Sequence, residues 1–415
     1  MSLTTSRSGW FQRLVVVAVC TAGVMAQRAP APALSPRGRA ELSSFLKTSV
    51  AHGDVPGAVV LVVGPDGVLY REAFGKQDVT GGVPMKTDSI FRIASMTKPL
   101  TSLVAMMLVE EGTLRLNDEV GTYLPKWTSP RVLASVDATT GAHTLRRATR
   151  AITIQHLLTH TSGIGYPWSH PGLAAIQKAS GTADLDLPLV NEPGERWMYG
   201  ASTRVLGQVI EAITGKGIDA VIAERLVGPL GMTDTSYAVP GTKLSRLVTV
   251  HQRTGGRLVE QPNPAEFVPT VRGDGGLVST ASDYERFLRM LLNDGMHEGR
   301  RVAPAAAIRA MTTNHLGALR VERQVAADVS RSKPYPLGAG TDTWGLGFQL
   351  AATPTDRTAR SEGSYSWAGI NNTHFWVDPA RRIGVVVLMQ VLPFYDEAAL
   401  AVLAGTERIV NTHVP

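Results

Sequence analysis

The sequence predicts an α/β (α+β) fold, in which one α/β domain is built from both ends of the chain and a helical domain is inserted between them. Apolar, β-branched runs typical of buried strands occur near the start, at 58–63, and near the end, at 383–389. The stretch between them is dominated by short helical patterns, such as 154–158 and 203–214. A sheet with strands from both ends leaves the middle of the chain as the insertion.

The expected boundaries follow from these patterns and from the N-terminal composition. Residues 1–26 are expected to be a signal peptide, and residues 27–37, rich in Pro and Ala, a flexible tether. The α/β domain is expected to comprise residues 38–94 and 250–415, and the mainly helical domain residues 95–249.

The first elements are predicted by periodicity. Residues 39–52 place apolar side chains on one face of a helix. The runs 58–63 and 68–74 form a strand pair, because Pro65-Asp66-Gly67 between them is a hairpin turn signal. A core stripe of Leu, Val and Met then predicts a helix from 95 to 111.

The last part of the chain is expected to be rich in strands. Thr280 is the expected N-cap of a helix at 280–292. A closing helix is expected at 397–410, after strands at 346–350, 373–377 and 383–389.

The N-terminus indicates export. Arg7 and Arg13 precede an apolar stretch, 14–24, that is too short to span a bilayer comfortably, and Val24-Met25-Ala26 resembles a cleavage site. An uncleaved membrane anchor is the alternative. Cleavage would remove Cys20, the only cysteine, and would exclude thiol catalysis. The mature protein is therefore expected in the periplasm or outside the cell, with no membrane span.

The composition is typical of a folded protein and gives no indication of nucleic-acid binding. The 415 residues are 44% hydrophobic and 18% charged, which is typical of a globular chain. The net charge of +6 includes Arg7 and Arg13, and the chain has no long Lys/Arg run. Nucleic-acid binding is therefore not expected. The oligomeric state is not indicated.

One short pattern suggests chemistry, because it places a hydroxyl beside an amine that could act as its base. Ser-x-x-Lys occurs three times, as Ser44 with Lys47, Ser95 with Lys98 and Ser330 with Lys333. The first pair falls on the polar face of a predicted helix and the third in a polar loop, so we set both aside.

Ser95 and Lys98 lie at a predicted helix start. Pro99 is tolerated only in the first helical turn, which puts that start near Ser95. Backbone N–H groups and the positive end of the helix dipole would then surround the hydroxyl, as an oxyanion site requires. A plain N-cap with a surface lysine is the alternative.

Further motifs give the chain a family resemblance. It resembles the serine β-lactamase and penicillin-binding-protein superfamily, in its class C-like branch and closest to the family VIII carboxylesterases. The resemblance covers roughly residues 38–410 and rests on Phe91–Pro99, Leu157–Gly163, Pro193-Gly194-Glu195 with Tyr199, Gly275–Thr280 and Trp344–Phe348. It implies an antiparallel sheet flanked by helices, an all-helical domain, and an active site between them.

The resemblance assigns roles to individual residues. It implies that Ser95 is acylated with Lys98 as its partner, and that Tyr199 shuttles the proton. Lys98 and Tyr199 would titrate as a coupled pair, with either a neutral lysine or an ionised tyrosine. The family usually has Tyr-x-Asn here, but Tyr199-Gly200-Ala201 lacks the asparagine, which weakens a lactamase interpretation.

The third family motif, Lys-Thr-Gly in lactamases, corresponds here to Trp367-Ala368-Gly369. Loss of the lysine removes a cation that would hold the carboxylate of a β-lactam or peptide, and Trp367 would offer an apolar wall for an ester. Gly369 would let the chain approach the substrate closely. By resemblance, the N–H groups of Ser95 and Ile370 would form the oxyanion hole.

These expectations combine into one function. The chain is expected to be an exported serine hydrolase that cleaves small carboxylic esters through an acyl-enzyme, with no cofactor and no metal. The alternatives are a β-lactamase or D-amino-acid peptidase of the same superfamily, and a noncatalytic module that binds peptidoglycan or a partner. His156 and His160 have zinc-binding spacing, but Leu157 stands where a zinc hydrolase needs a glutamate.

Overall fold

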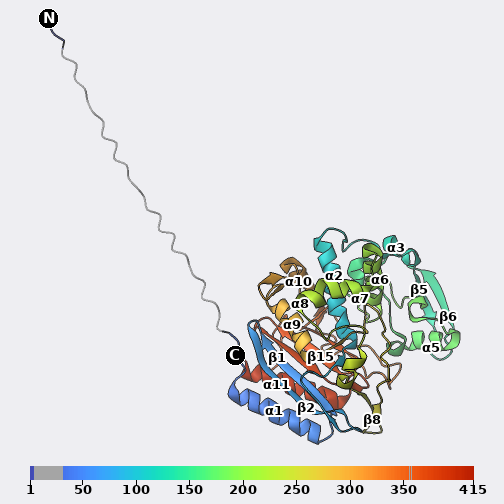
Figure 1. Ribbon diagram of the computed structural model, residues 1–415. Helices are drawn as coiled ribbons and strands as arrows, with labels where there is room; N and C mark the ends of the chain where they lie inside the picture. The colour runs from blue at the N-terminus through green and yellow to red at the C-terminus, as the bar shows by residue number, and fades with distance from the viewer. Residues whose placement is uncertain (4–30, 355, 357) are drawn as a thin grey trace. The chain divides into compact units, whose positions relative to one another are not determined.

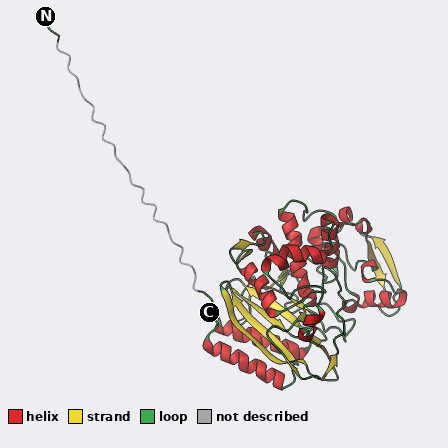
Figure 2. Cartoon of the chain, in the orientation of Figure 1, coloured by secondary structure: helices red, strands yellow, loops and turns green. Residues whose placement is uncertain are grey.

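The computed structural model describes residues 1–3, 31–354, 356 and 358–415, so residues 4–30 of the expected signal peptide and tether lie outside the described residues. Residues 32–415 form one compact unit (Figures 1 and 2). Its α-helices are α1 (Pro36–Ala51), α2 (Lys98–Glu110), α3 (Val120–Tyr123), α4 (Ile154–Leu158), α5 (Pro171–Ser180), α6 (Ser202–Thr214), α7 (Ile218–Ile222), α8 (Gly228–Leu230), α9 (Ala281–Leu292), α10 (Ala305–Met311) and α11 (Glu397–His413).

The strands are short except at the centre of the main sheet. They are β1 (Gly57–Gly64), β2 (Gly67–Asp78), β3 (Val83–Pro84), β4 (Phe91–Arg92), β5 (Arg131–Val136), β6 (His143–Arg147), β7 (Val250–Thr254), β8 (Arg257–Gln261), β9 (Val278–Ser279), β10 (Met296–His297), β11 (Arg300–Arg301), β12 (Thr343–Trp344), β13 (Gln349–Leu350), β14 (Tyr365–Gly369), β15 (Thr373–Asp378), β16 (Ile383–Leu388) and β17 (Val391–Leu392). No helix in the described part of the chain has both the length and the apolar character to cross a membrane.

The main sheet joins the two ends of the chain. Its eight strands run in the order β12-β13-β14-β15-β16-β1-β2-β3, and each neighbouring pair is antiparallel. The N-terminal β1 pairs with the C-terminal β16, with Val60 opposite Val387 and Val62 opposite Val385. This antiparallel sheet with its helices confirms the predicted fold class.

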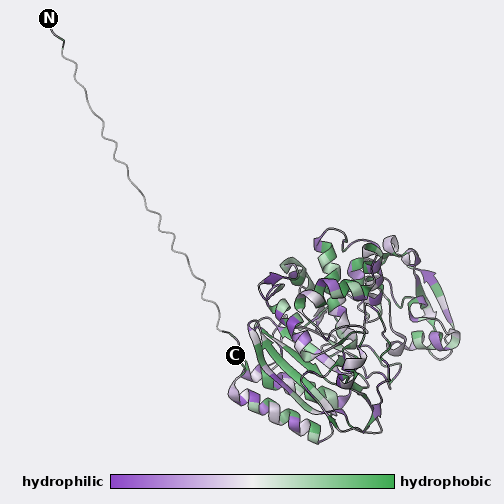
Figure 3. Ribbon diagram, viewed as in Figure 1, coloured by the Kyte–Doolittle hydropathy of each residue, from purple (hydrophilic) through white to green (hydrophobic). Residues whose placement is uncertain are grey.

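Both faces of the sheet are covered, which explains why β1 and β16 are apolar and buried at every position. Helices α1 and α11 lie side by side over one face (Figure 1), where Leu42 and Val402 share a core with Val60. Helix α9 packs on the other face, where Phe287 and Leu288 join a second core with Val59. Strand β1 at the centre of the sheet is accordingly mostly hydrophobic in Figure 3.

The structure differs from several of the predicted elements. Helix α1 begins at Pro36, because Ser35 Oγ caps the N–H of Gly38 at 3.1 Å, so the last two residues of the expected tether are helical. The strand expected at 346–350 is limited to β13. The segment 95–249 contains the β5–β6 hairpin, which lies mostly exposed and therefore lacks an alternating apolar pattern. The division into two domains stays a prediction.

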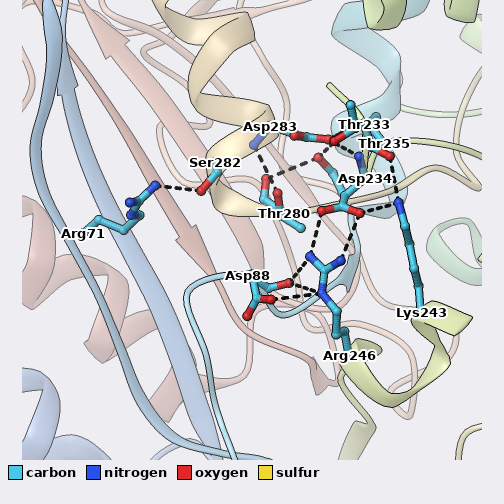
Figure 4. A network of polar contacts seen from close by, with 11 residues as sticks. Arg71, Asp88, Thr233, Asp234, Thr235, Lys243, Arg246, Thr280, Ser282 and Asp283 are labelled. Carbon is cyan, nitrogen blue, oxygen red and sulfur yellow. Dashed lines mark hydrogen bonds and ion pairs between the residues drawn. The ribbon is translucent and has the colours of Figure 1, made fainter. Parts of the chain in front are cut away.

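A polar network anchors the segment that precedes the region of Ser95 (Figure 4). Asp234 accepts hydrogen bonds from Arg246 and Lys243, while Asp283 accepts from the N–H of Asp234 and the hydroxyl of Thr235. Thr235 Oγ1 also lies 2.7 Å from the hydroxyl of Ser279 on β9. Because β9 pairs with β4, the network supports the strand that leads to Ser95.

Candidate active site

Ser95 lies in a tight turn between a short strand and a helix. Strand β4 holds Phe91 opposite Ser279 of β9, and the chain then turns at Ala94, whose φ of 44° is unusual for a residue with a side chain. Ser95 belongs to a single 3₁₀ turn, η1 (Ala94–Thr97), and α2 begins only at Lys98. The helix was expected to start near Ser95; Pro99 does lie in its first turn, as predicted.

Lys98 contacts Ser95 directly. Its Nζ lies 3.0 Å from Ser95 Oγ, 2.8 Å from the carbonyl oxygen of Asp274 and 3.2 Å from Tyr166 Oη. The lysine is 1% exposed, whereas Ser95 is only half-buried. Ser95 is thus partly accessible to solvent, whereas Lys98 is enclosed by the protein.

The environment favours the neutral form of this amine. Burial lowers the pKa of Lys98 to about 7; the carboxylate of Asp274 opposes this, and the charges of Arg204 and Arg272 add to it. A lysine whose pKa lies near 7 can accept a proton from a neighbouring hydroxyl at neutral pH. The contact between Lys98 and Ser95 therefore has the geometry and the basicity of a nucleophile–base pair.

Tyr199 is held in a group of rings that we call the aromatic wall, comprising His160, Trp197, Tyr199, Trp344 and Trp367. The ring centroid of Tyr199 lies 4.7 Å from that of Trp367 and 4.9 Å from that of His160. Trp367 Nε1 donates a 3.1 Å hydrogen bond to Tyr199 Oη. Lys98 Nζ lies 4.9 Å from the ring centroid of Tyr199.

The pKa of Tyr199 is raised above 10 by burial, although hydrogen bonds with Ser95 and Trp367 oppose the rise. The hydroxyl of Tyr199 therefore keeps its proton at neutral pH. Of the two states that the sequence leaves open, the structure favours the neutral lysine over the ionised tyrosine.

The other side of Lys98 is lined by four residues that we call the ionic wall: Tyr166, Arg204, Arg272 and Asp274. Tyr166 Oη donates a 2.5 Å hydrogen bond to Asp274 Oδ2, and Arg204 Nε lies 3.1 and 3.2 Å from the two carboxylate oxygens. Burial would raise the pKa of Asp274, but the charges of Lys98 and Arg204 outweigh it and keep the carboxyl ionised.

The ionic wall was not predicted from the sequence. Its signals were nevertheless present: Tyr166 follows the motif at Leu157–Gly163 by three residues, and Asp274 directly precedes Gly275-Gly276. Both motifs carry the family resemblance, and these two side chains lie close beside them in the sequence. The missing information was spatial, because Tyr166 lies 68 residues and Asp274 176 residues from Lys98.

A cavity of about 900 Å³ opens over Ser95. Its apolar lining includes Trp168, Leu277, Phe267, Ile370 and Phe394, and charged side chains of Arg92, Lys178, Arg204, Arg272, Asp328 and Arg331 also border it. Ile370 thus shares the cavity with Ser95, as the predicted oxyanion hole requires, and that role stays a prediction. A volume of this size can enclose a small organic substrate.

Trp367 and Gly369 lie behind the cavity. Trp367 is 5% exposed and borders a separate space of about 460 Å³, while Ala368 and Ile370 face the cavity of Ser95. A Cβ at Gly369 would lie 2.3 Å from the carbonyl oxygen of Ile93, so this glycine allows β14 to approach the turn before Ser95. Their expected substrate contacts stay predictions; their observed contacts support Tyr199 and Ser95.

Of the remaining sequence candidates, only His160 belongs to this site. The pairs at 44–47 and 330–333 are exposed at both ends, on α1 and in a loop. His156 Nδ1 accepts the N–H of Thr153 in a helix cap, and His160 belongs to the aromatic wall. Among the residues that the structure describes, no group of three His, Cys, Asp or Glu side chains is arranged to bind a metal ion.

Comparison with known proteins gives the family. The model of the family described as Beta-lactamase matches residues 42–406. Protein Rv1367c of Mycobacterium tuberculosis is 35% identical over 387 residues, which cover 86% of this chain and 92% of that protein. Esterase EstB of Burkholderia gladioli is 29% identical over 383 residues, covering 84% and 89% respectively.

A solved structure supports the same fold. A simvastatin synthase (LovD) mutant of Aspergillus terreus superimposes with a TM-score of 0.79 at 24% identity, covering 90% of this chain and 95% of that one. The family match extends over most of the compact unit, including the Ser95 turn and both walls. The chain therefore belongs to the Beta-lactamase family and is a serine hydrolase of the superfamily that includes esterases and acyltransferases.

Proposed function

We propose that the protein is an exported serine hydrolase that cleaves carboxylic esters through an acyl-enzyme on Ser95. The observation that carries this proposal is the 3.0 Å contact between Lys98 Nζ and Ser95 Oγ, with the lysine pKa lowered to about 7. A hydroxyl with a neutral amine at this distance can be deprotonated as it attacks a carbonyl.

Acylation follows from the positions of three side chains. Ser95 Oγ attacks the ester carbonyl and Lys98 takes its proton, while the N–H groups of Ser95 and Ile370 stabilise the oxyanion. Loss of one such donor typically costs ~3–4 kcal/mol of barrier. As the ester C–O bond breaks, Tyr199 gives its proton to the leaving alcohol and recovers one from Lys98. Water then attacks the acyl-serine by the reverse route and releases the acid.

Two features favour an ester over a β-lactam. Ala201 occupies the place of the family's asparagine, which contacts the amide side chain of β-lactams, and Trp367 supplies no cation at the third motif. The similarity to Esterase EstB supports the same choice. A β-lactamase, a D-amino-acid peptidase and a noncatalytic binding module remain the alternatives.

The test is hydrolysis of p-nitrophenyl butyrate by wild-type protein and by Ser95→Ala, with nitrocefin assayed in parallel. We expect ester hydrolysis by the wild type and its loss in a folded Ser95→Ala variant. Near wild-type turnover by this variant would contradict the assignment of Ser95. Nitrocefin turnover rivalling that of the ester would favour the lactamase. Failure of a fluorophosphonate probe to label Ser95 would favour the binding module.

The export part of the proposal rests on the sequence of residues 1–26. Expression of the full chain in a host with a general secretion pathway should give exported protein whose N-terminus begins after Ala26. N-terminal sequencing of that protein checks the cleavage site. Retention of the intact N-terminus in the membrane fraction would instead support the uncleaved anchor.

A further inference from the structure

Arg272 borders the cavity over Ser95 with a guanidinium group that donates no hydrogen bond to the described part of the protein. It borders that cavity, and its side chain is 42% exposed. Within the part of the chain that the structure describes, its guanidinium donates no hydrogen bond, and its nearest acidic atom, Asp274 Oδ1, lies 3.6 Å from Nε. The guanidinium N–H groups that do not face Asp274 thus have no acceptor among the described residues and can bind a ligand in the cavity.

Asp274 does not neutralise the positive charge of Arg272, because its carboxylate is bonded to other residues. Its carboxylate already accepts hydrogen bonds from Arg204 and Tyr166, and it is 2% exposed. The ionic wall therefore contains two guanidinium groups for one carboxylate, and Asp184, the second carboxylate nearby, pairs with Arg204 at 3.4 Å. Arg204 forms the close pair and is 16% exposed, whereas Arg272 stands at the edge that meets the solvent.

Arg92, a half-buried cation of the cavity, is already bonded to the protein. Arg92 donates to the carbonyl oxygen of Val248 at 3.1 Å and to Asn263 Oδ1 at 2.9 Å. Lys178 and Arg331 also border the cavity and, like Arg272, are exposed, but of the three only Arg272 is near enough to Lys98 for its charge to lower the pKa of that lysine.

The position of Arg272 relative to Ser95 is set by a tight turn. The N–H of Gly275 bonds to the carbonyl oxygen of Arg272 at 3.3 Å, which folds the segment back on itself. A Cβ at Gly275 would lie 3.7 Å from Arg272 Nη2 and also 3.7 Å from the carbonyl oxygen of Ala94. The guanidinium is thus separated from the residue before Ser95 by about the width of one small side chain, which Gly275 leaves empty.

We propose that Arg272 binds a carboxylate carried by the acyl part of the substrate, so that the preferred substrates are monoesters of short dicarboxylic acids. The inference rests on the proposed ester cleavage at Ser95. The alcohol leaves toward Tyr199 in the aromatic wall, so the acyl part faces the ionic wall, to which Arg272 belongs. A guanidinium can bind a carboxylate through two parallel hydrogen bonds, and the partly enclosed cavity strengthens them.

Two esters of equal length test the charge alone. The monoester p-nitrophenyl hydrogen adipate carries a carboxylate, and p-nitrophenyl methyl adipate has the same chain with the charge capped. We measure kcat/KM for both, with the rate without enzyme subtracted, and take the ratio of the anionic to the neutral ester. We expect the wild type to favour the anionic ester and Arg272→Gln to lower the ratio by about tenfold or more, mainly through KM.

The control variants separate a local contact from general charge. Arg272→Lys keeps the charge and should retain part of the preference. Arg300→Gln removes one exposed positive charge from β11, outside the cavity, and should leave the ratio within about twofold of wild type. A ratio that Arg272→Gln leaves unchanged, or that falls only with Lys178→Gln or Arg331→Gln, overturns the inference.

A binding measurement keeps this inference separate from the proposed function. Monomethyl adipate and dimethyl adipate are titrated into Ser95→Ala by calorimetry, and again into Ser95→Ala with Arg272→Gln. We expect the monomethyl ester to bind more tightly than the dimethyl ester, and the second substitution to remove that difference. If this holds while the wild type hydrolyses neither p-nitrophenyl ester, ester cleavage fails and anion recognition stands. Equal binding with and without Arg272 contradicts the inference, even where ester hydrolysis is observed.

Discussion

The aromatic wall and the ionic wall both contact Lys98, but the first consists of uncharged rings and the second mainly of charged side chains. The aromatic wall around Tyr199 consists of rings, and His160 within it is buried, which lowers its pKa well below the usual value and keeps it uncharged. The ionic wall holds one carboxylate between two guanidinium groups. Lys98 donates to Tyr166 on one side and lies against the ring of Tyr199 on the other.

The difference between the walls indicates what each does. Rings remove water without adding charge, which favours the neutral forms of both Lys98 and Tyr199. The ionic wall adds one negative and two positive charges, which act on Lys98 in opposite directions. The aromatic wall would thus lower the pKa of Lys98, so that its amine can act as a base at neutral pH. The charges of the ionic wall would then set the exact value of that pKa.

Removing the amine of Lys98 should lower kcat more than any other substitution outside Ser95, because Lys98 is the proposed base and both walls set its pKa. Lys98→Met replaces the base with an apolar side chain of similar length in a site that is 1% exposed. We expect kcat for p-nitrophenyl butyrate to fall by about 10²–10⁴-fold, with the thermal unfolding midpoint retained. A folded variant with at least a tenth of wild-type kcat would show that another group deprotonates Ser95.

The two tyrosines offer a direct comparison of the walls by the same substitution. Tyr199→Phe removes the proposed proton donor to the leaving alcohol and should lower kcat by about 10²–10³-fold. Tyr166→Phe removes a hydrogen bond to Lys98 and another to Asp274, and should lower kcat by only about tenfold. Steady-state kinetics of the two variants would reverse the assignment if the larger loss followed Tyr166→Phe.

The pH profile should reveal the ionic wall. Since the neutral form of Lys98 is the base, kcat/KM should fall as the pH drops below about 7. Asp274 raises the lysine pKa, so Asp274→Asn should move this acidic limb to lower pH. Arg204 lowers that pKa, so Arg204→Gln should move the limb to higher pH. Shifts in the same direction for both variants would indicate a structural effect instead, and circular dichroism checks that each variant is folded.

A smaller effect is expected at the back of the aromatic wall. Trp367→Phe keeps a ring beside Tyr199 but removes the donor of the 3.1 Å hydrogen bond to its hydroxyl. The loss of one neutral hydrogen bond, about 0.5–1.5 kcal/mol, predicts a kcat about two- to tenfold lower. A large rise in KM with unchanged kcat would instead support the substrate wall predicted from the sequence.

Outside both walls, a polar substitution should affect stability alone. Asp234 is bonded by Arg246 and Lys243 in the network of Figure 4, and the hydrogen bond from Arg246 is the main reason that its pKa is lowered. Asp234→Asn should lower the free energy of unfolding by about 1 kcal/mol at pH 7, as for a partly buried ion pair that is still screened by solvent, with kcat retained.

The pH dependence of that loss follows from the lowered pKa. The carboxylate of Asp234 contributes its stabilisation above the ordinary aspartate pKa and loses it as the pH falls through the lower folded-state value. Wild type and Asp234→Asn should therefore differ in urea unfolding at pH 7 and converge below about pH 4. An equal difference at both pH values would mean that the charge is not responsible.

The sequence predicted the parts of the site that local patterns encode. Ser95, Lys98 and Pro99 lie within five consecutive residues, and β1 and β16 are apolar runs, so the turn and the centre of the sheet could be anticipated. The direction in which the Trp367 side chain points could not be predicted, because it depends on the register of β14 with β15 and on the position of the Tyr199 ring. Nor could the pairing of Asp274 with Arg204 and Tyr166, since long-range packing brings these residues together.

The most direct test of an acyl-enzyme is the mass of the protein during turnover. The wild type is mixed with p-nitrophenyl butyrate, quenched in acid within milliseconds and digested for mass spectrometry. The proposed mechanism predicts one butyryl group on the peptide that contains Ser95, at a level that rises and then decays as substrate is consumed, and none in Ser95→Ala. Ester hydrolysis without an adduct on Ser95, or with the adduct on another residue, would contradict it.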